Sequence, residues 1–319
     1  MSAPVVEARG LGKRYDDIVA VDGVDLTIEA GDVYGFLGPN GAGKTTTLRM
    51  LLGLITPTAG SSRLFGRDPM IEGPRALDGV AGFVEAPRFY PYLSARRNLE
   101  LCAAFDGGES AERIDEALAV VDLTARAKHK VGGYSHGMRQ RLGVAASLIR
   151  QPRLLILDEP QTGLDPAGIR DMRDLVRTLS EQGMTVLLSS HVLAEVDEIC
   201  NRIAIILSGR ILYEGDLPGL RERTRQSSGY ALRTTDDAAA RSILGDRFGA
   251  VTLADEEPGL IVGCAEDEVA GISLVLAAEG IGVVSLTSTR RTLEEIFLEL
   301  TGGAAGAPEA ASTPLVGVS

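Results

Sequence analysis

A glycine-rich segment that ends in lysine and threonine constrains this chain more than any other feature. Residues Gly38–Thr45 read Gly-Pro-Asn-Gly-Ala-Gly-Lys-Thr, after the apolar run Val33–Leu37 and before the helical pattern Thr45–Leu52. Glycines let backbone N–H groups converge on phosphate oxygens, and the N-terminus of the following helix adds positive potential. Lys44 would bridge the terminal phosphates, and the Thr45 hydroxyl would bind Mg²⁺. The predicted nucleotide-binding residues are Gly38, Pro39, Asn40, Gly41, Ala42, Gly43, Lys44, Thr45 and Thr46.

A second segment places two carboxylates directly after a strand. Leu154–Leu157 is entirely apolar, as in a strand covered on both faces of a parallel sheet, and Asp158 and Glu159 follow it. Asp158 would hold Mg²⁺ directly or through water, and Glu159 would polarise the attacking water as general base. An acidic pair is common at strand ends, but the Gln-Thr-Gly-Leu-Asp segment within Pro160–Pro166 makes this pair more specific.

Strand and helix patterns alternate over residues 4–216 and predict one α/β domain with nucleotide at the carboxyl ends of a mainly parallel sheet. The alternating segment Ile18–Ile28 predicts an antiparallel strand pair that covers one edge. Residues 93–148 are nearly all helical in pattern and predict an inserted helical subdomain. The predicted strands are Val33–Leu37, Val80–Val84, Leu154–Leu157, Val186–Leu188 and Ile203–Leu207, and the predicted helices include Thr45–Leu52, Gly168–Ser180 and Val192–Cys200.

The pattern changes after Asp216 to that of a smaller α+β domain, residues 217–301. Its order of strand, helix, two strands, helix and strand fits a ferredoxin-like unit, with a final helix at Thr292–Leu300. Residues 302–319 are rich in Ala, Gly and Pro without periodicity, which predicts a disordered tail. The six predicted elements are Tyr230–Arg233, Asp237–Leu244, Val251–Ala254, Leu260–Gly263, Glu266–Glu279 and Gly282–Leu286.

Residues Val5–Gly215 resemble the ATP-binding subunit of an ABC transporter, a P-loop ATPase with a RecA-like core. The resemblance rests on the phosphate loop, the acidic pair and Tyr134–Arg141, which reads Tyr-Ser-His-Gly-Met-Arg-Gln-Arg and matches the signature segment. It implies that Ser135 and Gly137 contact the γ-phosphate bound by a partner subunit. It therefore implies a homodimer in which each signature segment closes the partner's site over ATP.

Three further residues match motifs of that family. Asp165, in Gly163–Pro166, corresponds to the D-loop that crosses between subunits, and His191 corresponds to the switch histidine that touches the γ-phosphate. Tyr15 corresponds to the aromatic residue on which adenine stacks. The alternative for Tyr15 is a half-buried strand aromatic, and the alternative for His191 is a structural histidine.

The sequence departs from the usual family motifs at two places. Tyr134, His136 and Met138 replace residues of the usual Leu-Ser-Gly-Gly-Gln signature, and Glu85 stands where most relatives carry a glutamine that contacts Mg²⁺. A carboxylate still binds Mg²⁺ but donates no hydrogen bond. The Glu85 segment resembles the bacitracin and lantibiotic exporter branch, and Arg291–Leu298 is similar to the ending of daunorubicin-type exporters. The role of His136 stays open.

Three aromatic residues, Phe89, Tyr90 and Tyr92, crowd beside Glu85 in a chain that is only 4% aromatic. One interpretation is that they anchor the helical insertion to the core. The other is that they line a groove that receives a short helix of a membrane partner.

The formal net charge of −12 argues against nucleic acid as the main partner. No apolar run approaches the length of a membrane helix, the N-terminus lacks signal-peptide features, and three scattered cysteines suggest no disulfide framework. The prediction is an exporter ATPase that binds ATP and Mg²⁺, works with a separate permease and is cytoplasmic, held at the inner face of the membrane by that permease. A soluble ABC ATPase acting on ribosomes or nucleic acid is the alternative, and a nutrient importer is a third. The transported substrate stays open.

Overall fold

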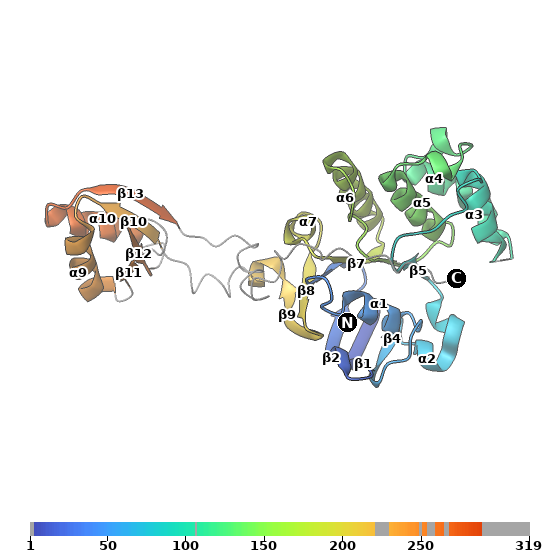
Figure 1. Cartoon of the computed structure of the whole chain (residues 1–319), viewed down its shortest axis with the longest axis horizontal. Coiled ribbons are helices and arrows are strands. Elements are labelled where there is room, and N and C mark those ends of the chain that lie inside the picture. Colours follow the sequence, from blue (N-terminus) through green and yellow to red (C-terminus); the bar gives the residue numbers. More distant parts are fainter. Residues whose placement is uncertain are drawn as a thin grey trace, which may run out of the picture. The chain divides into compact units, whose positions relative to one another are not determined.

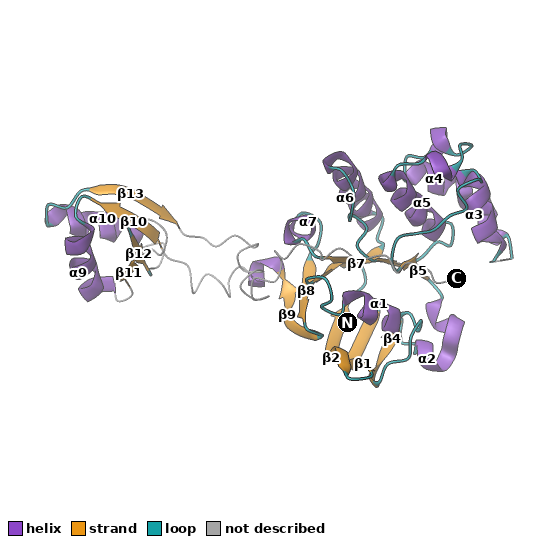
Figure 2. Cartoon of the chain, in the orientation of Figure 1, coloured by secondary structure: helices purple, strands orange, loops and turns teal. Residues whose placement is uncertain are grey.

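The computed structural model describes residues 3–105, 107–220, 230–248, 251–253, 259–264 and 268–288. The chain divides into two compact units, with the division between Leu217 and Pro218. Figures 1 and 2 show the elements of each unit. The predicted final helix Thr292–Leu300 and the predicted tail 302–319 lie outside the described residues.

A six-stranded sheet forms the centre of the first unit. Its strand order is β5-β6-β7-β3-β8-β9, and all neighbours are parallel except β8 and β9. Strands β3, β6 and β7 are buried along their whole length, and the apolar sequences of β3 and β6 fit that burial. The strands are β3 (Val33–Leu37), β5 (Val80–Phe83), β6 (Leu154–Leu157), β7 (Thr185–Ser190), β8 (Arg202–Leu207) and β9 (Arg210–Asp216).

A three-stranded antiparallel sheet, in the order β2-β1-β4, completes the strands of this unit. The prediction of a strand pair within Ile18–Ile28 is wrong, because that segment is the single strand β2 (Ile18–Ile28). It pairs with β1 (Val6–Tyr15). The β1–β2 register is irregular around Gly23, which has a positive φ, and the chain continues through this point without reversing direction. β1 pairs on its other side with β4 (Ala59–Leu64).

Helix α1 (Lys44–Leu51) lies between the two sheets. Its residues Leu48 and Leu51 are fully buried in a core that both sheets share. Figure 1 shows α5, α6 and α7 on the opposite side of the main sheet. The other helices of this unit are α2 (Pro69–Glu72), α3 (Ala95–Ala104), α4 (Ile114–Val120), α5 (His136–Leu148), α6 (Pro166–Glu181) and α7 (Leu193–Asp197), with short 3-10 segments at Gly73–Leu77, Glu109–Arg113, Thr124–Arg126 and Val131–Gly133.

The helical insertion occupies the predicted stretch between β5 and β6. It comprises α3, α4 and α5, and the Ser94 side chain caps α3 by accepting a hydrogen bond from the Arg97 N–H at 3.2 Å. Helix α7 is shorter than the predicted Val192–Cys200, because the chain leaves the helix after Asp197 in a turn that leads into β8. The α/β core, the antiparallel sheet and the helical insertion are therefore confirmed.

The second unit is a small α+β fold with the predicted order of elements. Its four strands lie in the order β11-β12-β10-β13, and every neighbouring pair is antiparallel, as in a ferredoxin-like unit. Leu232, Leu260, Ile272 and Leu276 are fully buried in its own core. The elements are β10 (Tyr230–Thr234), α9 (Asp237–Phe248), β11 (Val251–Leu253), β12 (Leu260–Val262), α10 (Val269–Ala278) and β13 (Val283–Ser288).

Candidate nucleotide-binding site

The phosphate loop connects β3 to α1, and two of its glycines have no room for a side chain. A Cβ on Gly38 would lie 2.4 Å from the Ile206 carbonyl oxygen, and a Cβ on Gly43 would lie 2.6 Å from the Ala20 carbonyl oxygen. Gly43 also has a φ of 108°, which favours glycine. Gly41 has a φ of 79°, and a Cβ on it would meet no atom within 4 Å. The path of the loop therefore depends on Gly38 and Gly43, where a side chain would clash with backbone atoms.

The Lys44 ammonium lies inside this loop and is almost fully buried. Its Nζ donates hydrogen bonds to the carbonyl oxygens of Gly38 at 2.7 Å and Pro39 at 3.2 Å. The same Nζ lies 3.2 Å from a carboxylate oxygen of Glu159. The structure thus brings the predicted phosphate-binding lysine and the predicted general base into one ion pair.

The Asp158 carboxylate is buried and surrounded by donors. One oxygen accepts hydrogen bonds from the Thr45 hydroxyl at 2.9 Å and the Glu85 backbone N–H at 3.3 Å. The other oxygen accepts one from the Ser189 hydroxyl at 2.5 Å. Mg²⁺ prefers oxygen ligands such as carboxylates and hydroxyls, which it takes together with phosphate oxygens. Asp158 and Thr45 offer one of each, and the two groups are already in contact. The residues present therefore fit a magnesium ion.

The Glu85 carboxylate is not part of this cluster. It forms an ion pair with Arg49 at 2.6 Å and its side chain is 63% exposed, while only its backbone faces Asp158. Its φ of 69° lies in the left-handed region, which turns the chain sharply after β5. The predicted Mg²⁺ contact of this side chain would require it to leave Arg49.

Glu159 follows Asp158 with a φ of 47°. Its carboxylate accepts a hydrogen bond from the Thr162 hydroxyl at 2.9 Å, and the His191 Nδ1 lies 3.4 Å from the same oxygen. Burial raises the pKa of the Glu159 carboxyl, but the Lys44 ammonium, the Thr162 hydroxyl and the His191 ring outweigh it and hold the pKa below its ordinary value. Among the described residues, the buried His191 Nδ1 has no hydrogen-bond partner.

Sequence reasoning missed two residues of this network. Ser189 donates to the Asp158 carboxylate and accepts a hydrogen bond from the Glu159 backbone N–H at 2.9 Å, so it holds the Asp158 carboxylate and the Glu159 backbone in place relative to β7. Its position directly after the apolar run Val186–Leu188, two residues before His191, was the available signal. In the sequence, Thr162 stands out only as part of a motif. The hydrogen bond from its hydroxyl to the Glu159 carboxylate cannot be inferred from spacing.

The remaining predicted residues lie at or near the ends of helices or strands outside the phosphate loop. Ser135 caps α5 by accepting the Met138 N–H at 3.2 Å, and Asp165 caps α6 by accepting the Gly168 N–H at 2.9 Å. Ser135 and Asp165 are exposed. Tyr15 is 42% exposed, with the Lys13 Nζ 5.0 Å from its ring centre. In the described parts of the chain, no hydrogen bond or ion pair joins these residues or Gly137 to the phosphate loop.

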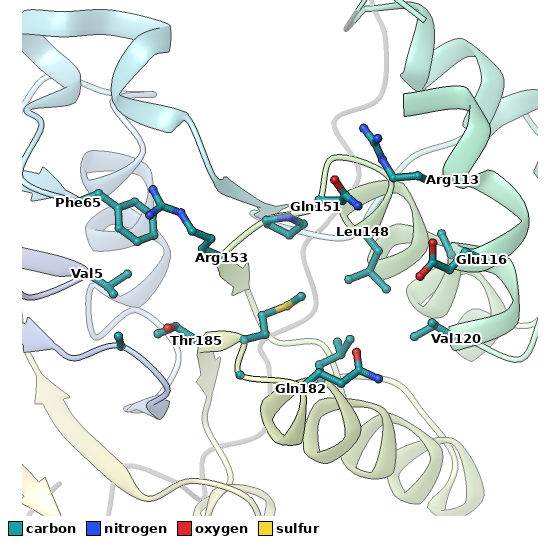
Figure 3. Close-up of a pocket in the computed structure, with 16 residues that line it drawn as sticks. Val5, Phe65, Arg113, Glu116, Val120, Leu148, Gln151, Arg153, Gln182 and Thr185 are labelled. Carbon is teal, nitrogen blue, oxygen red and sulfur yellow. The ribbon is translucent and has the colours of Figure 1, made fainter. Parts of the chain in front are cut away.

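A separate pocket of about 580 Å³ lies at the opposite edge of the main sheet (Figure 3). Arg153 and Thr185, at the amino ends of β6 and β7, line it, whereas Asp158 and His191 follow the carboxyl ends of those strands. The Arg153 guanidinium lies 3.9 Å from the ring centre of Phe65. The pocket contains none of the predicted site residues.

Comparisons with known proteins identify the family of this chain. Residues 21–162 match the family model described as ABC transporter. The chain is 38% identical over 301 residues to the bacitracin transport ATP-binding protein BcrA of Bacillus licheniformis, and the match covers 94% of this chain and 98% of the relative. It is 36% identical over 305 residues to the daunorubicin/doxorubicin resistance ATP-binding protein DrrA of Streptomyces peucetius, covering 93% and 92%.

A solved structure is also similar to this chain: the dimeric ATP-binding cassette MJ0796 in a post-hydrolysis state, bound to ADP and Pi. Its TM-score is 0.60 at 26% identity, and the match covers 66% of this chain and 98% of that one. The chain belongs to the ATP-binding proteins of ABC transporters, and its resemblance to the antibiotic and drug exporter branch is confirmed. Within the described residues, no helix is both long and apolar enough to cross a bilayer.

Proposed function

We propose that this protein is the ATP-hydrolysing subunit of an exporter, which couples ATP-driven closure of a homodimer to export of a drug, antibiotic or lipid through a separate permease. The observation that carries the proposal is the cluster of Lys44, Thr45, Asp158, Glu159 and His191 at one edge of the sheet. Relatives named for bacitracin transport and daunorubicin resistance match nearly the whole chain, which supports export rather than a soluble ribosomal role.

The chemistry assigned to the cluster is hydrolysis of the terminal phosphate. A water oxygen bonds to the γ-phosphorus, the bond from that phosphorus to the bridging oxygen breaks, and Glu159 accepts the proton of the water. Lys44 and the loop N–H groups would bind the phosphates. Thr45 and Asp158 would hold Mg²⁺, which would neutralise phosphate charge when bound. His191, whose Nδ1 lies 3.4 Å from Glu159, would contact the γ-phosphate.

The direct test is ATP-driven efflux. Inverted membrane vesicles that contain this chain and a co-expressed permease should take up a transported drug only with MgATP, and a Glu159→Gln variant should abolish that uptake. Binding of the chain to ribosomes, without association with any membrane protein, would instead favour the alternative function. Both arms use the full chain.

Dimer closure is supported by the position of the signature segment. Ser135 and Asp165 are exposed, and neither contacts the phosphate loop of its own chain, so they are available to a second copy. The similar cassette MJ0796 has been solved as a dimer. A two-fold symmetric pair would place each signature segment against the partner's nucleotide.

We expect Ser135→Arg to block MgATP-induced dimerisation while nucleotide binding to the monomer stays within about twofold. An arginine at this position would occupy the space that the partner's phosphate needs. The measurement is light scattering with and without MgATP, in a Glu159→Gln background that prevents turnover. Because Ser135 also caps α5, a cap loss of about 1 kcal/mol is expected too, and Ser135→Ala controls for it. Dimerisation of the arginine variant would contradict the sandwich arrangement.

Permease docking is supported by a second cavity, of about 330 Å³, beside the Glu85 segment. Phe89 lines it, together with Pro87 and Phe105, and the Phe105 side chain is 92% exposed. Tyr90 is fixed through its backbone, which exchanges hydrogen bonds with the Asn98 side chain at 2.8 and 3.1 Å, while the residue is 54% exposed. Backbone anchoring with an exposed ring favours the docking interpretation over the core-anchor interpretation.

Replacing both Phe89 and Tyr90 by Ala is expected to release the subunit from membranes that contain its permease. ATP hydrolysis by the isolated subunit should persist, since neither ring contacts the phosphate loop. Co-purification with membranes and the ATPase rate are measured on each variant, and Glu85→Gln, which weakens the pair with Arg49, should change coupling more than hydrolysis. An unfolded double variant, or one that stays membrane-bound without hydrolysis, would support the core-anchor interpretation.

A further inference from the structure

His136 connects the signature segment to the loop that follows β6. It is the first residue of α5, and its Nε2 lies 3.0 Å from the Thr162 carbonyl oxygen. A Cβ on Gly163 would lie only 3.6 Å from the imidazole ring, and the φ of Gly163 is 76°. The ring therefore lies beside a loop turn that favours glycine, and His136 precedes Thr162 by 26 residues in the chain.

The loop that His136 contacts also holds the general base. The Thr162 hydroxyl donates to a carboxylate oxygen of Glu159 at 2.9 Å, and the other oxygen of Glu159 pairs with Lys44 at 3.2 Å. His136, at the start of α5, thus contacts the carbonyl of Thr162, and the hydroxyl of Thr162 contacts the Glu159 carboxylate. A continuous set of short contacts runs from the N-terminus of α5 to the phosphate loop.

The contact fixes where the imidazole carries its proton. A carbonyl oxygen only accepts, so the His136 Nε2 must be the donor. The Gln140 Nε2, 3.4 Å from the same ring nitrogen, would then face another donor, while the buried Gln140 Oε1 has no hydrogen-bond partner among the described residues. Turning the Gln140 amide over removes the clash of two donors, because its oxygen would then share the single His136 Nε2–H with the Thr162 carbonyl.

We propose that His136 is a positioning residue for hydrolysis: by donating to the Thr162 carbonyl, it holds the loop so that the Thr162 hydroxyl orients the Glu159 carboxylate. The inference rests on the proposed function. It assigns a role to the residue that departs from the usual signature, and it links the signature segment to the base of its own subunit. A partner that presses on the start of α5 would thereby affect the orientation of Glu159.

The experiment compares two replacements of His136 in the full chain. His136→Ala removes the donor and should lower kcat about tenfold, the size expected for one hydrogen bond that positions a catalytic group, while KM for ATP stays within about twofold. His136→Gln keeps an amide N–H at a reach similar to Nε2 and should retain at least about half of the wild-type kcat. Thermal melting and binding of a fluorescent ATP analogue establish that both variants fold and bind nucleotide.

A double-variant cycle with Thr162→Val separates positioning from general stability. Valine keeps the backbone carbonyl and the side-chain shape but removes the hydroxyl on Glu159. If His136 acts through that hydroxyl, His136→Ala should lower kcat less than about twofold in the Thr162→Val background. Full additivity of the two losses, or a wild-type kcat for His136→Ala, would overturn the inference and leave the proposed function standing. A wild-type chain without MgATP hydrolysis would overturn both.

Discussion

Replacing Glu159 by Gln is expected to lower ATP turnover by at least about 100-fold and to leave MgATP bound. The amide has the shape of the carboxylate but cannot accept the proton of the attacking water, and general-base catalysis contributes about 10²–10⁴-fold. Nucleotide binding should persist, because Lys44, Thr45 and the loop N–H groups are unchanged. The trapped protein should then dimerise in MgATP, seen as a doubled mass in light scattering.

The ion pair between Lys44 and Glu159 adds a reason for this expectation. Without nucleotide, the ammonium helps to hold the pKa of the Glu159 carboxyl below its ordinary value. A bound phosphate competes for Lys44 and removes that attraction, so the pKa of Glu159 should rise and the carboxylate should become a stronger base. Glu159→Gln also removes the competing carboxylate, so its affinity for ATP should equal or exceed that of the wild type.

Glu181→Gln is a matched control, since Glu181 is an exposed carboxylate at the end of α6. It should leave turnover unchanged within error. A Glu159→Gln variant that hydrolyses ATP within threefold of the wild-type rate would remove Glu159 from the mechanism. A variant that fails to bind ATP would show that the carboxylate supports the loop rather than the chemistry.

The sequence alone predicts strand bounds and the grouping of site residues where the local pattern and the burial agree. Val33–Leu37 and Leu154–Leu157 are strands with the predicted bounds, because both are short apolar runs of the kind that a strand buried on both faces favours. The site residues that follow them could be placed together because the carboxyl ends of parallel strands share one edge. The convergence of Lys44, Thr45, Asp158 and Glu159 was predictable for that reason.

The features that the sequence could not predict depend on partners that are distant in sequence. The Glu85 carboxylate pairs with Arg49, 36 residues earlier, and no local pattern indicates that pair. Strand β2 runs through Asp22 and Gly23, which locally favour a turn, because β1 pairs with it on both sides of that point. The contacts of Ser189 with Asp158 and of His136 with Thr162 also span separate elements.

Lys44→Ala is expected to weaken ATP binding by roughly 10- to 100-fold, the loss of one hydrogen bond to a charged group at about 1.5–3 kcal/mol. Titration of a fluorescent ATP analogue measures the effect, and Lys128→Ala, an exposed lysine, is the control. Lysine 44 also has a role without nucleotide, because its ammonium satisfies the carbonyl oxygens of Gly38 and Pro39 and pairs with Glu159.

The two roles of Lys44 can be separated by the stability of the nucleotide-free protein. Lys44→Ala should lower the melting temperature of the wild type, since it leaves a partly buried carboxylate without its cation. In a Glu159→Gln background, Lys44→Ala should lower the melting temperature by less, because no carboxylate remains to be paired. An equal fall in melting temperature in both backgrounds would mean that the ion pair does not stabilise the nucleotide-free protein. Phosphate would then reach Lys44 without displacing Glu159, and the proposed rise in the pKa of Glu159 on ATP binding would lose its cause.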